Sequence, residues 1–128
     1  MKAFSPDLAE IEALARAAFD SLPARIRAQL DGVVIRIEDF PDPETEQEIG
    51  MESPFDLLGL YQGVSLDQKS LAASVADIDM IFLYRRPILD YWCRTGEDLT
   101  HVVRHVLIHE IGHHIGLSDS DMYRIERS

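Results

Sequence analysis

The sequence predicts a compact α+β domain, in which a small sheet of about three strands packs against helices that include one long helix. Three short apolar runs, at residues 33–37, 57–64 and 80–84, have the length and composition of strands. Longer segments on either side of them carry apolar residues at helical spacing. Three strands against several helices favour an α+β domain over a doubly wound one.

The N-terminal part of the chain is predicted to form two helices and a strand. Ser5 or Asp7 can open the first helix. Its apolar residues recur every three or four positions: Leu8, Ile11, Leu14, Ala15, Ala18 and Phe19. A second short helix is expected at residues 24–30, closed by Gly32, and the β-branched run at 33–37 follows as a strand.

The middle of the chain is less regular. Residues 38–54 carry seven acidic side chains among seventeen residues, together with three prolines and a glycine, so we expect a solvated loop. Residues 57–64 predict a strand punctuated by glycines, and residues 66–76 fit either a loop or a helical turn. Residues 80–84 predict an apolar strand.

The C-terminal part of the chain is predicted to be helical. Residues 87–95 can form one helix, and Asp98 or Thr100 can cap a long helix that runs to about His114. Residues 118–127 predict a terminal helix.

Charge and composition restrict the function classes. With 12 basic and 23 acidic residues the net charge is −11, which disfavours nucleic acid and anionic membrane surfaces as partners. The single cysteine, Cys93, cannot form an internal disulfide and suits a reducing compartment. We find no secretion signal and no apolar run near the ~20 residues that span a bilayer. We therefore expect one cytoplasmic domain over residues 1–128, for which a monomer is plausible.

The most informative segment is residues 109–119, which read HEIGHHIGLSD. His109 and His113 are one helical turn apart, so both imidazoles can reach a single ion. Glu110 lies about 100° around the same helix, where it can touch a water on that ion. Gly116 ends the helix, and Asp119 is the first residue after it that can complete the site.

The helical phase keeps the ligands apart from the core. With His109 at zero, His113 falls near 40° and Glu110 near 100° at about 100° per residue. The arc from about 120° to 260° is predicted to pack into the core. It contains Val103, Leu107, Ile108, Ile111, His114 and Ile115.

Several residues near the motif have a simpler interpretation. His101 and His105 are expected to be solvated or to support the ligands, and His114 to be a structural histidine on the core side. Asp119 could serve only as a helix cap, in which case Asp121 or Glu126 would be the substitute ligand. Candidates for stabilising an oxyanion are Tyr84, Tyr123, His105 and His114.

The run His109-Glu110-x-x-His113-x-x-Gly116-x-x-Asp119 resembles the zincin metallopeptidases, and in detail a small bacterial zincin-like family with a minimal metalloprotease domain. Residues 22–23, 33–39, 58–64 and 81–87 also look like that family. The resemblance implies a zincin-like fold with an active-site helix beside a small sheet. It also implies an edge strand that pairs with an extended substrate peptide, for which we choose Met80 to Tyr84.

The resemblance implies a role for each residue of the motif. His109, His113 and Asp119 would bind Zn²⁺, and Glu110 would be the general base. The commoner extended zincin motif has a third histidine where Asp119 stands, and an aspartate there is acceptable to zinc. No long downstream segment remains for a Met-turn, and Met122 is too close to serve as one.

Three function classes follow. The first is a zinc-dependent metallopeptidase that acts on a peptide or protein substrate. The second is a metal-binding interaction module with weak or no hydrolytic activity. The third is a metal-dependent RNase, which the charge of −11 and the presence of Glu110 disfavour.

Overall fold

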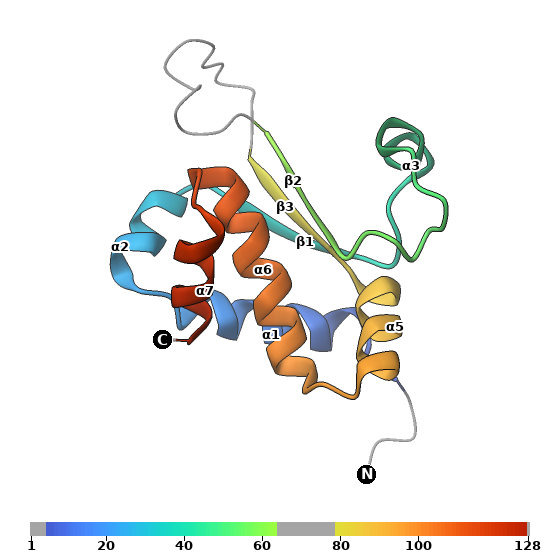
Figure 1. Ribbon diagram of the computed structural model, residues 1–128, viewed down its shortest axis with the longest axis horizontal. Coiled ribbons are helices and arrows are strands. Elements are labelled where there is room, and N and C mark those ends of the chain that lie inside the picture. The colour runs from blue at the N-terminus through green and yellow to red at the C-terminus, as the bar shows by residue number, and fades with distance from the viewer. Residues whose placement is uncertain (1–4, 64–78, 128) are drawn as a thin grey trace.

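The computed structural model describes residues 5–63 and 79–127. These residues form an α+β fold with a three-stranded mixed sheet, which confirms the predicted fold class (Figure 1). The elements in chain order are α1 (Leu8–Asp20), α2 (Ala24–Arg27) followed by a 3-10 turn (Ala28–Leu30), β1 (Val34–Glu38), α3 (Pro43–Ile49), β2 (Gly59–Gln62), β3 (Met80–Tyr84), α5 (Arg85–Thr95), α6 (Leu99–Ile115) and α7 (Asp119–Arg127). The segment at 66–76 lies outside the described residues.

Helix boundaries follow the capping residues. The side chain of Asp7 accepts a hydrogen bond from the backbone N–H of Glu10 at 2.8 Å and starts α1. Asp98 accepts one from Thr100 at 2.8 Å and starts α6. Gly116 ends α6 in the left-handed conformation, with φ at 72°, which glycine adopts without steric cost.

The sheet has the strand order β1-β3-β2, so the choice of residues 80–84 as an edge strand is wrong. β3 is central: it pairs with β1 in parallel and with β2 antiparallel. The physical reason is burial: Ile81, Leu83 and Tyr84 are at most 2% exposed, and continuous apolar sequence is typical of strands in the interior of a sheet. Within the described residues, β2 is the edge strand that contacts α6.

The acidic segment at 38–54 is not simply a loop, because it contains the helix α3. Asp42 caps this helix by accepting a hydrogen bond from Thr45, Pro43 lies in its first turn, and Gly50 ends it with φ at 76°. The same residues that suggested a loop therefore act as helix start and stop signals. α3 buries no residue and lies apart from the other helices in Figure 1.

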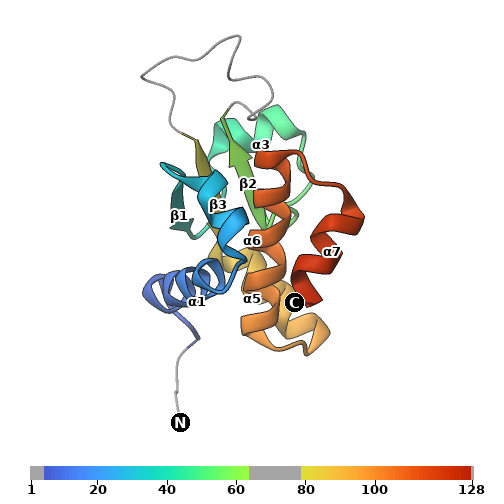
Figure 2. The ribbon, with the colours of Figure 1, turned by 90° about the vertical axis from the view of Figure 1, so that its left-hand side faces the viewer.

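The core lies between the sheet and two helices. α1 and α6 pack against each other, α1 also contacts β1, and α6 contacts β2 and β3. Figure 2 shows α6 in the middle of the molecule, with α7 on one side and α1 on the other. Among the described helices, none is both long enough and apolar enough to cross a membrane.

Candidate metal centre

Helix α6 separates a core side from a side that carries ionisable groups. Val103, Leu107 and Ile111 are at most 1% exposed, as the helical phase predicted. Burial also reaches Val102 and Val106, because β2 and α5 contact α6 beyond the predicted arc. The histidines of the motif remain more open, and the side chain of His113 is 60% exposed.

Glu110 is the buried member of the motif, with 8% of its surface exposed. Burial raises the pKa of its carboxyl above the usual value, because the charged form loses solvation. The positive charge and hydrogen bond of His113 oppose that rise, as do a hydrogen bond from the backbone N–H of Tyr61 and the charge of His109. His113 Nδ1 lies 3.3 Å from Glu110 Oε1. The motif therefore presents a desolvated carboxyl group beside two imidazoles.

The edge strand β2 lies directly against this carboxyl group because Gly59 has no side chain. A Cβ at Gly59 would lie 2.7 Å from Val106 Cγ1 and 3.2 Å from Glu110 Cγ, closer than the packing permits. Tyr61 is two residues further along β2, so it faces α6 on the same side as Gly59. Gly59 thus sets the close approach of the sheet edge to Glu110.

A buried polar cluster holds the other end of β2. The Tyr61 hydroxyl lies 3.2 Å from Asp79 Oδ1 and donates to it, and the Tyr61 ring packs edge-on against His114. His114 is 1% exposed with Nδ1 3.9 Å from Asp79 Oδ2, which confirms its expected position on the core side. The sequence analysis missed Tyr61 and Asp79, although two-residue alternation along β2 could have placed Tyr61 against α6.

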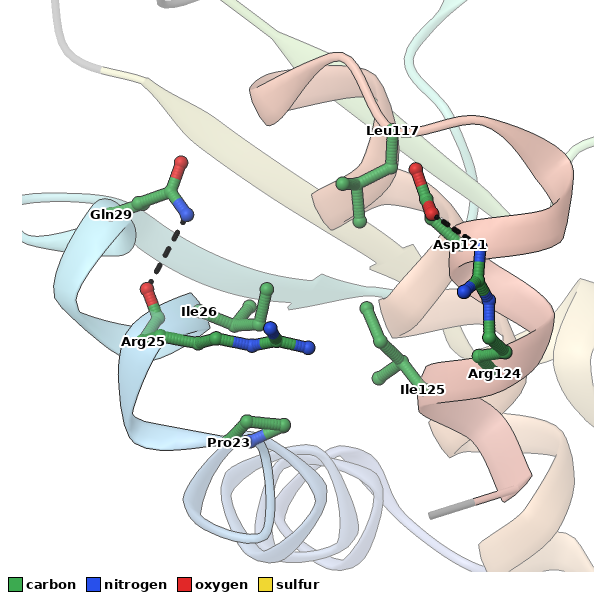
Figure 3. A pocket seen from close by; sticks show the side chains of 8 residues that line it. All are labelled: Pro23, Arg25, Ile26, Gln29, Leu117, Asp121, Arg124 and Ile125. Atoms are coloured by element: carbon green, nitrogen blue, oxygen red, sulfur yellow. Dashed lines mark hydrogen bonds and ion pairs between the residues drawn. The ribbon is translucent and has the colours of Figure 1, made fainter.

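A hollow of about 270 Å³ opens between β2 and α6 at the candidate centre. Its lining combines apolar side chains with the ionisable ones: Leu57, Leu58, Gly59, Tyr91, Val102, His105, Val106, His109 and Glu110. A second hollow of about 390 Å³ lies between α2 and α7, with its side chains drawn in Figure 3. That hollow is lined by Asp121, the substitute ligand of the sequence analysis, but by none of the four residues His109, Glu110, His113 and Asp119.

Asp119 is the first residue of α7 and is exposed. The cap of α7 is Ser118, whose hydroxyl accepts a hydrogen bond from the N–H of Asp121 at 3.1 Å. Asp121 is itself engaged, because it accepts from Ser118 N and pairs with Arg124 at 3.1 Å. Asp119 thus starts the helix without acting as its cap.

The described residues bring together a different set of three potential ligands from the predicted one. The ligand atoms of His105, His109 and Glu126 lie within 4.8 Å of one another. His113 and Asp119 do not join His109 in a set of this kind within residues 5–63 and 79–127. Zinc binds imidazole and carboxylate donors of this kind. The set of His105, His109 and Glu126 therefore fits that ion.

The two tyrosines named as candidates for stabilising an oxyanion differ in solvent exposure. Tyr84 is 2% exposed, and burial, together with the charges of Glu38, Asp42 and Glu110, raises its pKa to about 12. Tyr123 is 56% exposed and packs under the guanidinium group of Arg127.

A histidine pair with a buried carboxyl group, set against the edge of a small sheet, is the arrangement expected of a metal-dependent peptidase. The model of the zincin-like metallopeptidase family matches residues 30–128. The chain belongs to this family of zincin-like metallopeptidases. A comparison with curated proteins found no match.

Proposed function

We propose that this protein is a zinc-dependent peptidase in which Glu110 is the general base and His109, His113 and Asp119 bind the metal. The observation that carries the proposal is the position of Glu110: buried, beside both motif histidines and against the edge strand β2. Membership of the metallopeptidase family supports the same reaction class.

The proposed ligands have a simple structural basis. His109 and His113 are one turn apart on α6, a rigid element held by its buried side. The left-handed turn at Gly116 reverses the chain, so that α7 packs back on α6 and Asp119 stands at its start. Zinc held here would act as a Lewis acid toward a peptide carbonyl and would acidify a bound water.

Glu110 would supply the proton transfers. Its carboxylate accepts the proton of the attacking water and then donates it from the same carboxyl group to the leaving amine. Burial supports this role, because it raises the pKa of Glu110 above its usual value and so makes the carboxylate a stronger base. Such a base contributes about 10²- to 10⁴-fold to the rate.

The substrate proposed for this site is an extended peptide. β2 is an edge strand of the sheet and contacts α6, and an edge strand can pair with another extended chain. The adjoining hollow is lined by Leu57, Val102 and Val106, so an apolar side chain of the peptide fits it. A site on so small a domain suits short or unstructured peptides.

A specific observation favours a second candidate, a metal-binding module without hydrolytic activity. Glu110 already interacts with His113 and with the N–H of Tyr61. A carboxylate held by these partners could act in packing the edge strand alone. Only an activity measurement separates this role from that of a general base.

We also propose that residues 1–128 act as one domain. The family match begins at residue 30, after α1 and α2. α1 nevertheless packs on α6 and contributes Ile11 and Ala15, both 0% exposed, to the common core. A chain without α1 would expose the core side of the active-site helix.

The test is hydrolysis of fluorescently labelled casein by the zinc-loaded full chain and by Glu110→Gln. We expect the variant to keep its zinc and to lose about 10²- to 10⁴-fold in rate. Glu97→Gln, a change at a partly exposed residue just before α6, is the control and should keep full activity. Unchanged hydrolysis in Glu110→Gln contradicts the assignment of the base, and zinc-loaded protein without hydrolysis favours the binding module.

Metal analysis tests the ligands separately. His109→Ala should lose zinc relative to the wild type after identical loading and desalting. Equal zinc contents in the two proteins would contradict every function that uses this metal site.

A further inference from the structure

A cluster of three potential ligands begins one turn before the family motif and includes the first histidine of that motif. His105 and His109 are four residues apart on α6, with ring centroids 4.3 Å apart and ring planes at 43°. Glu126 comes from α7 and contacts His105 Nδ1 through Oε1. The ligand atoms of all three lie within 4.8 Å of one another.

The backbone that carries Glu126 is anchored to α6 next to this cluster. Arg104 donates to the carbonyl oxygens of Ile125, at 3.1 Å, and of Glu126. The side chain of Ile125 is 6% exposed and belongs to the core. Glu126 itself is shielded, with its side chain 13% exposed, whereas that of His105 is 48% exposed. The fold therefore presents a fixed carboxylate to two imidazoles.

The donors have the chemistry of a transition-metal site. Two imidazoles and one carboxylate suit zinc and its neighbours, whereas calcium and magnesium prefer oxygen ligands alone. Donors of a tetrahedral zinc ion lie about 3.4 Å apart when each is about 2.1 Å from the metal. The three ligand atoms of the cluster, all within 4.8 Å of one another, are close to that separation.

Space for a further ligand lies on both sides of the cluster. His105 lines the hollow of about 270 Å³ between β2 and α6, together with His109. It also lines a hollow of about 420 Å³ that contains Glu126 and Tyr123. An ion at the cluster would therefore have an open position, which water or a small ligand can occupy.

We propose that His105, His109 and Glu126 form a second divalent transition-metal site, which shares His109 with the peptidase site. One imidazole nitrogen of His109 serves one ion at a time, so the two positions compete for it. The competition rests on the proposed function, whereas the metal site itself does not. In a peptidase, an ion bound by His105, His109 and Glu126 would be in a resting position, because His109 would then be unavailable to the catalytic site.

The test of the site is Co²⁺ binding, followed by the visible absorption of the bound ion and by competition with a chromophoric chelator. The background is His113→Ala/Asp119→Asn, which removes the other proposed ligands and leaves the cluster intact. We expect this chain to bind one Co²⁺. Adding Glu126→Gln or His105→Asn should weaken that binding at least about tenfold.

The controls separate ligand loss from misfolding. Glu126→Gln keeps the backbone carbonyl that Arg104 binds, and far-ultraviolet circular dichroism checks each variant. His101→Asn changes the preceding histidine, which pairs with Glu97 rather than with the cluster, and should bind Co²⁺ like the background. No Co²⁺ binding in the background, or binding that neither Glu126→Gln nor His105→Asn weakens, overturns the site.

A second measurement tests the competition alone. Because Glu126→Gln removes the resting position, it should raise the rate of casein hydrolysis at one zinc per chain. An unchanged or lower rate overturns the competition. Absence of hydrolysis in the wild type contradicts the proposed function, and the Co²⁺ measurement still decides the site.

Discussion

The two sides of α6 are built in opposite ways. One side, with Val103, Leu107 and Ile111, is closed against other elements and is at most 1% exposed. The other presents His105, His109 and His113 at successive turns, and the side chains of His105 and His113 are 48% and 60% exposed. One helix therefore supplies both the stability of the fold and its candidate chemistry, from different side chains.

Glu110 lies at the boundary between these sides. It is buried like a core residue, yet its neighbours are His113 and His109 on the open side. A carboxyl group at this boundary is desolvated while it remains next to the groups that would hold a metal. The boundary is thus the place where packing changes the acidity of a functional group.

The largest expected difference between the two sides is in stability. Leu107→Ala should lower the free energy of unfolding by about 2–5 kcal/mol, because it leaves a cavity in the core. His113→Ala should change it by no more than about 0.5 kcal/mol in metal-free protein, because that side chain is exposed. Urea unfolding, monitored by circular dichroism, measures the free energy of unfolding of both variants. Equal losses would mean that the open side also supports the fold.

Metal removal tests whether the core side of α6 depends on the metal site. Zinc at 100 times its dissociation constant should stabilise the folded chain by about 2.7 kcal/mol through binding alone. Chelation should therefore lower the melting temperature and leave the far-ultraviolet spectrum unchanged at 25 °C. Loss of helical signal on chelation would show that the core side depends on the metal. His109→Ala is the control, since its melting temperature should not respond to zinc.

Gly59→Ala tests the contact between the sheet edge and the boundary residue. The new methyl group would lie too close to Val106 and Glu110 and should cost about 1–3 kcal/mol of stability. Val106→Ala in the same chain should restore part of the loss, because it removes the nearest atom. Thermal unfolding of the two single variants and the double variant measures this coupling. Additive losses would contradict a direct clash.

The smallest effect concerns pH. Burial, followed by the charge and hydrogen bond of Asp79, raises the pKa of Tyr61 to about 12 from 10.0. The stability linked to Tyr61 should be fully present below pH 10 and lost as the pH rises toward 12, because only the unfolded chain ionises readily there. Absorbance at 295 nm, compared with Tyr61→Phe, follows this group. Titration of Tyr61 near pH 10 would contradict its burial.

Local signals in the sequence predicted most of the helices. Asp7 and Asp98 are the caps that the sequence offered as alternatives, and the core arc of α6 follows from helical periodicity. The helix α3 was missed because Pro43 and Gly50 were interpreted as breakers rather than as the first turn and the end of a helix. Each of these features depends on residues within a turn or two of one another.

Long-range pairing could not be predicted in this way. Local periodicity was enough to predict the α+β class and the core arc of α6, whereas the burial of Glu110 was not foreseen. Only the tertiary structure decided that β3 is central, that Gly59 brings β2 against Glu110, and that Glu126 meets His105. The physical reason is that these contacts join residues 18 or more positions apart in the chain, whose meeting depends on the packing of the whole core.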